Sequence, residues 1–100
     1  TRIADRVIEH HAATRRFRRS LRQLSLEEPT VRAARTESRV RQIAAVRALN
    51  GALRPERIAA TLMQVERLAD AVAEGEFDDL GLADRAARKE LARLIDELRG

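Results

Sequence analysis

The sequence predicts an all-α protein, an antiparallel bundle of about four amphipathic helices whose first helix is long. The 44% apolar fraction consists of 18 Ala and 26 larger side chains, 12 of them Leu, and both Ala and Leu lose little free energy on entering a helix. The chain has no Tyr or Trp and only two Phe, and its β-branched residues do not alternate as a half-buried strand requires. One hundred residues are enough for one domain, expected over 1–100.

The first helix is expected over residues 3–24, where a stripe of side chains recurs in alternating steps of four and three. Such a stripe keeps one side of a helix against a partner. Two of its middle positions are polar. Either Ile8, His11 and Ala12 share the burial there, or the polar pair fixes the register with a partner helix. The stripe, called the seam below, comprises Ile3, Val7, His10, Thr14, Phe17, Leu21 and Leu24.

Three further helices are expected over 31–49, 55–74 and 82–98. Pro29 disfavours helix at the residue before it, which predicts a break over 25–30. Pro55 suits the first turn of the third helix, and Gly75 ends that helix. Short connections between amphipathic helices favour antiparallel neighbours in a bundle.

Charge divides the chain into a basic and an acidic half. Residues 1–54 hold 13 Arg and 5 acids, a net charge of +8, whereas residues 55–100 hold 7 bases and 11 acids, a net charge of −4. The densest positive segment has five Arg within eight residues. This Arg cluster consists of Arg15, Arg16, Arg18, Arg19 and Arg22.

The Arg cluster has three interpretations. If Phe17 faces the core, most of the cluster lies about 100° to 200° away, on the solvated back of the helix. Otherwise the cluster contacts the phosphates of a nucleic acid or docks an acidic protein segment. The linker between the third and fourth helices supplies a candidate for that segment, and if it makes no such contact it is an exposed loop. Its acidic run consists of Glu74, Glu76, Asp78 and Asp79.

Catalytic and metal-binding motifs are not visible in the sequence. Cys is absent, which excludes disulfides and thiol chemistry. His10 and His11 are adjacent, so on a helix they point about 100° apart and lack the i, i+4 spacing of helical metal sites. We therefore expect no enzyme activity, no catalytic residue, no metal and no cofactor. No apolar run approaches the roughly 18 residues that span a bilayer, and we expect a cytoplasmic protein without a membrane partner.

Residues 53–62 (LRPERIAATL) resemble the opening of a helix-turn-helix motif, with Pro at a helix start followed by Ile-Ala-x-x-Leu. The resemblance ends there, because the helical pattern continues to Val72 where a tight turn should come. The sequence thus predicts a non-enzymatic helical protein-protein interaction module that self-associates as a dimer or pairs with a partner helix. The alternative is a nucleic-acid-binding regulatory or accessory protein that uses the Arg cluster.

Overall fold

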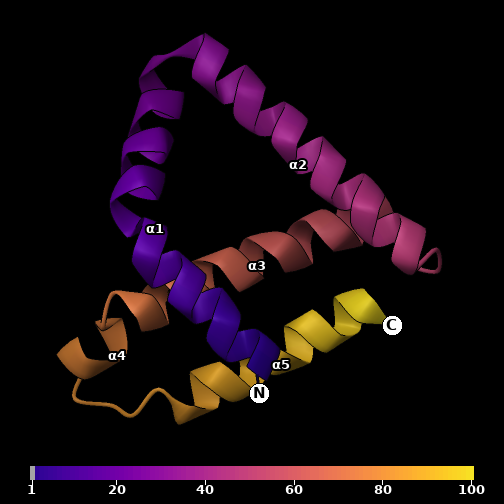
Figure 1. The fold of residues 1–100 in the computed structure, drawn as a ribbon. Coiled ribbons are helices and arrows are strands. Elements are labelled where there is room, and N and C mark those ends of the chain that lie inside the picture. Colours follow the sequence, from indigo (N-terminus) through magenta and orange to yellow (C-terminus); the bar gives the residue numbers. More distant parts are fainter. Residues whose placement is uncertain (1) are drawn as a thin grey trace.

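The computed structural model describes residues 2–100 and confirms the all-α class. Within this range there are four long helices, one single-turn helix and no strand (Figure 1). The helices are α1 (Arg2–Glu27), α2 (Pro29–Leu49), α3 (Pro55–Ala73), α4 (Glu76–Asp79) and α5 (Arg85–Arg99).

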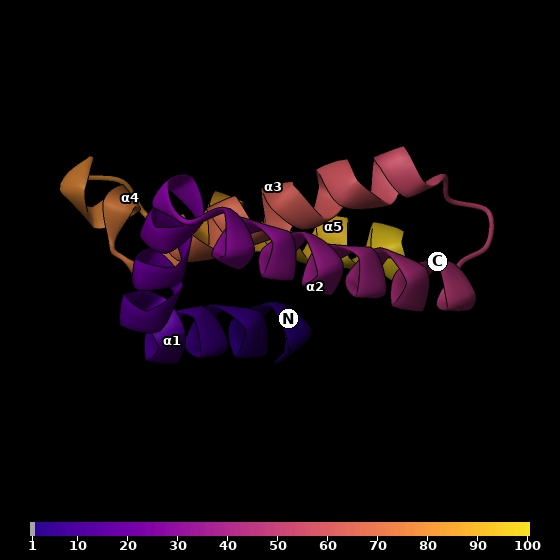
Figure 2. The ribbon, with the colours of Figure 1, turned by 90° about the horizontal axis from the view of Figure 1, so that it is seen from above.

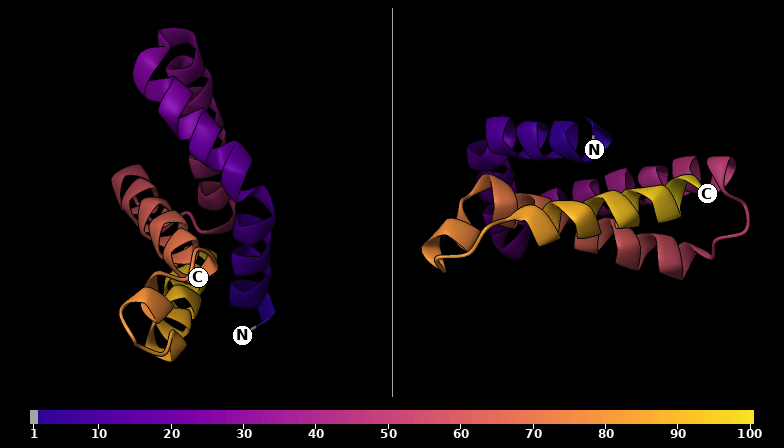
Figure 3. Two further views of the ribbon diagram at one scale, coloured as in Figure 1. Left: turned by 90° about the vertical axis from the view of Figure 1, so that its left-hand side faces the viewer. Right: turned by 90° about the horizontal axis from the view of Figure 1, so that it is seen from below.

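The long helices enclose a triangle. α1, α2 and α3 form its three sides, and α5 lies along α3 beneath the first half of α1 (Figure 1). Views from above and from the side show that α1 crosses one face of the α3–α5 pair (Figures 2 and 3). The molecule is flat, with extents of 37 × 36 × 18 Å. The arrangement of all four long helices as one antiparallel bundle is therefore not confirmed.

The corner between α1 and α2 is a single residue, Glu28, and not the break expected over 25–30. Glu28 is extended (φ −116°, ψ 109°) and its N–H donates to the Leu24 carbonyl at 2.6 Å, which closes the last turn of α1. Pro29 excludes helix only at the residue before it and suits the first turn of a new helix. One proline therefore ends α1 and starts α2 without a loop.

The connection from α3 to α5 is longer than the sequence predicts. Gly75 ends α3 with φ +76°, a conformation that residues with a side chain rarely adopt, and the single turn of α4 follows. Gly81 has φ +71°, and the N–H of Leu82 returns to the Phe77 carbonyl at 2.9 Å. Leu82 therefore belongs to the turn, and α5 begins at Arg85 instead of residue 82.

The core lies where the first half of α1 meets α3 and α5. Ile58 and Leu91 are its largest fully buried apolar side chains, and Thr61 beside them donates its hydroxyl to the Arg57 carbonyl at 2.8 Å. No residue of α2 is buried. Residues 2–100 include no helix with both the length and the apolar character needed to cross a membrane. The buried apolar residues are Ala4, Ile8, Ile58, Val65, Ala69, Ala71, Val72, Ala87, Leu91, Leu94 and Leu98.

Candidate functional site

The face of α1 that turns inward is displaced by one residue from the seam. Phe17 is 68% exposed, so the expectation that it faces the core is wrong, whereas His11 is buried. The inward positions have the same alternating spacing of four and three residues as the seam. Only in the first half of the helix are they occupied by apolar side chains. This inward stripe comprises Ala4, Ile8, His11, Arg15, Arg18, Arg22 and Ser25. Arg15 and Arg22 are exposed to solvent, and Arg18 is half-buried.

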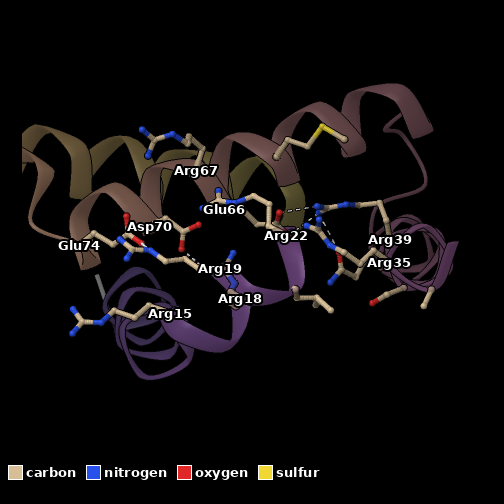
Figure 4. Close-up of a pocket in the computed structure, with 15 residues that line it drawn as sticks. Arg15, Arg18, Arg19, Arg22, Arg35, Arg39, Glu66, Arg67, Asp70 and Glu74 are labelled. Atoms are coloured by element: carbon tan, nitrogen blue, oxygen red, sulfur yellow. Dashed lines mark hydrogen bonds and ion pairs between the residues drawn. The ribbon is translucent and has the colours of Figure 1, made fainter. Parts of the chain in front are cut away.

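Arg15, Arg18 and Arg22 of the inward stripe line a pocket of about 420 Å³ between α1, α2 and α3 (Figure 4). Seven Arg and three acids line it, which gives the pocket a net charge of +4. Four members of the Arg cluster face it, and Arg16 does not. The charged lining residues are Arg15, Arg18, Arg19 and Arg22 from α1, Arg35 and Arg39 from α2, and Glu66, Arg67, Asp70 and Glu74, of which the first three lie on α3 and Glu74 directly follows it.

Asp70 is the acid through which α1 is joined to α3. Arg18 donates to its carboxylate and lies beside the His11 ring, and His11 Nδ1 is 2.7 Å from the same carboxylate oxygen. The side chains of Asp70 and Arg18 are 15% and 26% exposed. A carboxylate this far from water is stabilised by the charged and polar donors around it, so these contacts hold the middle of α1 on α3.

Two further ion pairs connect α2 and α1 to α3 and the residue that follows it. Arg39 on α2 binds Glu66 with both guanidinium NH groups, at 2.8 and 2.7 Å. Arg19 on α1 donates to Glu74 at 3.0 Å. Because α2 buries no side chain, the fork between Arg39 and Glu66 is one of the specific contacts that position it.

Three of the lining arginines have no carboxylate partner among residues 2–100: Arg15, Arg22 and Arg35. Arg35 is nevertheless held in place, because it donates to the hydroxyl of Ser25 at 2.8 Å. Ser25 is buried and donates in turn to the Arg22 carbonyl at 2.7 Å. The pocket thus contains positive charge that the described part of the chain does not neutralise.

The four residues of the acidic run lie in different surroundings and do not form one contact surface. Glu74 reaches the Arg cluster through Arg19, whereas Glu76 forms a two-pronged pair with Arg67, with both distances 2.9 Å. The hydrogen bonds from Arg67 lower the pKa of Glu76, and the same contact raises the pKa of Arg67. Asp78 and Asp79 are exposed and make no ion pair within residues 2–100.

The seam lies on the flank of α1. Phe17 and Leu24 are among the exposed large apolar residues, as is Ile3, while Val7, Thr14 and Leu21 are half-buried and His10 is exposed. Thr14 satisfies its hydroxyl within the helix, on the His10 carbonyl at 2.8 Å. Val7 packs against the core and Leu21 lines the pocket, so Ile3, Phe17 and Leu24 are the apolar seam residues that stay exposed. Pairing of the seam with a partner stays a prediction.

Residues that matter in the pocket but were not expected from the sequence are Ser25, Arg35, Arg39, Glu66 and Asp70. The inward stripe is visible in the sequence as a second series of positions in steps of four and three, one residue after the seam. Its arginines, however, are typical of a solvent-exposed helix face. Within residues 2–100 no group of three or more potential metal ligands gathers. No family model, no curated protein and no solved structure matches this chain.

Proposed function

We propose that this protein is a non-enzymatic helical association module that pairs with a second copy of itself through the seam of α1. The observation that carries the proposal is its large accessible surface, 7176 Å² for a chain of 11.3 kDa. A folded monomer of this mass exposes about 5,700 Å². The excess of roughly 1,400 Å² is larger than the ~800 Å² that each partner buries in an interface of standard size.

The seam is the part of this surface best suited to a second helix. Phe17 and Leu24 are seven residues apart, so they lie on the same side of α1, and Ile3 extends the exposed apolar line toward the N-terminal end of the helix. A 4–3 stripe is self-complementary when two copies pair about a two-fold axis. Burying one Phe contributes about 1.5–3 kcal/mol, and a dimer buries two.

Phe17→Ser is expected to weaken dimerisation by at least about tenfold, because it removes the largest apolar side chain of the seam. Sedimentation velocity at tens of micromolar measures this directly. Leu80→Ser is the matched control, since Leu80 is 69% exposed against 68% for Phe17 but lies beyond α4, away from the seam. A wild-type protein that sediments as a monomer, or an equal effect of both substitutions, would contradict the proposal.

Nucleic-acid binding through the Arg cluster is the alternative, and the +8 charge of residues 1–54 supports it. Against it, Arg18 and Arg19 are engaged by Asp70 and Glu74, and four of the five cluster residues line the pocket between the helices. Arg16 alone in the cluster lies outside that lining. Titration with random duplex and single-stranded DNA in low salt tests this alternative, and failure to bind there removes it.

A further inference from the structure

We infer that the pocket between α1, α2 and α3 binds a small anion that carries two or more phosphoryl groups. The inference goes beyond self-association and does not depend on it, because Phe17 and Leu24 of the seam do not line the pocket, although Leu21 does. Three observations carry it: the unneutralised charge of the pocket, the way its arginines are held, and its size.

The charge of the pocket is unbalanced. Arg15, Arg22 and Arg35 face it without a carboxylate partner among residues 2–100. The spacing of α1 also places Arg22 one turn beyond Arg18, and like charges at i, i+4 repel each other. A bound anion relieves this repulsion and supplies the missing partners.

The guanidinium groups of Arg35 and Arg39 are positioned before any ligand arrives. Arg35 is held by the buried Ser25 hydroxyl at 2.8 Å, and Arg39 is held by both oxygens of Glu66. Figure 4 shows Arg22 and Arg35 at the end of the pocket where Arg39 meets Glu66. Planar guanidinium groups donate in pairs, a geometry that matches the oxygens of a phosphoryl group.

The size and net charge of the pocket select the ligand class. A volume of about 420 Å³ falls within the range of small-molecule pockets, and it is far too small for a nucleic-acid duplex. Arg67 is neutralised by Glu76, which lies outside the lining, so the unpaired charge of the pocket is that of three arginines. Three positive charges are more than one phosphate neutralises, since a phosphate monoester carries about −1.5 to −2. Two or three linked phosphoryl groups match both properties.

Isothermal titration calorimetry with inorganic tripolyphosphate tests the inference, with sulfate at equal ionic strength as the reference anion. We expect tripolyphosphate to bind with a dissociation constant below about 100 μM and sulfate to bind much more weakly. Arg22→Gln and Arg35→Gln should each weaken tripolyphosphate binding about tenfold or more, because each removes charge-assisted hydrogen bonds. Both variants should keep the wild-type sedimentation behaviour, which separates this test from that of self-association.

Arg16→Gln is the matched control, because it removes the same charge from the same helix but at a position outside the pocket. It should change tripolyphosphate binding less than about twofold. An equal loss in Arg16→Gln would show diffuse attraction to the basic helix and overturn the inference. So would the absence of tripolyphosphate binding, or tighter binding of a random DNA duplex than of tripolyphosphate. Should Arg22→Gln or Arg35→Gln fail to fold, Arg15→Gln at an exposed position carries the same expectation.

Discussion

Leu91→Ala is expected to lower the free energy of unfolding by about 3 kcal/mol, the largest effect of any single substitution considered for this protein. Leu91 is 0% exposed and lies on α5 among the buried side chains of α1 and α3. The truncation removes apolar contacts and leaves a cavity that close-packed neighbours fill only in part. A chain of this length shifts its melting temperature by about 4–8 °C for each kcal/mol, so a fall of more than about 12 °C should be seen.

Leu82→Ala provides the control for this prediction. Leu82 is exposed in the turn before α5, and its truncation should change the free energy of unfolding by less than about 0.5 kcal/mol. Chemical denaturation followed by circular dichroism measures both variants. If Leu91→Ala and Leu82→Ala cost the same, the core does not lie where α1, α3 and α5 meet.

Asp70→Ala should cost about 2–3 kcal/mol, although Asp70 is polar and not part of the apolar core. Its removal leaves the half-buried Arg18 cation and the buried His11 without their acceptor, and an uncompensated charge away from water is expensive. This loss of unfolding free energy is smaller than the usual value for a fully buried ion pair, because 26% of the Arg18 side chain is exposed to water. The same denaturation experiment measures it.

Asp79→Ala is the matched substitution for this second prediction. Asp79 is exposed on α4 and makes no ion pair within residues 2–100, so its loss should leave the unfolding midpoint unchanged. If Asp79→Ala proved as destabilising as Asp70→Ala, the cost would reflect the overall charge balance of the chain and not the contacts of α1 with α3.

The helices themselves could be predicted from the sequence, because they depend on local properties. Ala and Leu content, the two helix-starting prolines and Gly75 locate four long helices to within a few residues. The boundaries that differ have local causes as well. Pro29 starts a helix instead of merely ending one, and Gly81 extends the turn before α5.

The orientation of α1 could not be predicted, because it depends on residues far away in the sequence. Apolar periodicity favours the register that contains Phe17, since Phe17 and Leu21 are the largest apolar side chains in the middle of α1. The register observed buries Ala4 and Ile8 in the core and brings Arg18 and Arg19 to Asp70 and Glu74, which lie more than 50 positions along the chain. A pattern of hydrophobicity assigns arginine to solvent and contains no information about acids on another helix.

The pocket could not be predicted from the sequence for the same reason, although the charge asymmetry is visible in it. The sequence shows that a basic half and an acidic half exist, and the acidic run was the obvious partner for the Arg cluster. Only the fold shows that one acid of that run, Glu74, reaches the cluster, that Asp70 provides the other contact to the cluster, and that Glu66 binds Arg39 on α2. Asp78 and Asp79 remain exposed outside the pocket lining.

A double-mutant cycle between Arg18 and Asp70 tests most directly whether α1 turns Arg18 toward α3 and leaves Phe17 exposed. The free energy of unfolding is measured for the wild type, Arg18→Ala, Asp70→Ala and the double variant. We predict a coupling energy of about 1.5–3 kcal/mol, as expected for a hydrogen-bonded charge pair shielded from water. Costs that add to within about 0.5 kcal/mol would show that the two side chains do not interact, and would contradict both the orientation of α1 and the pocket it forms.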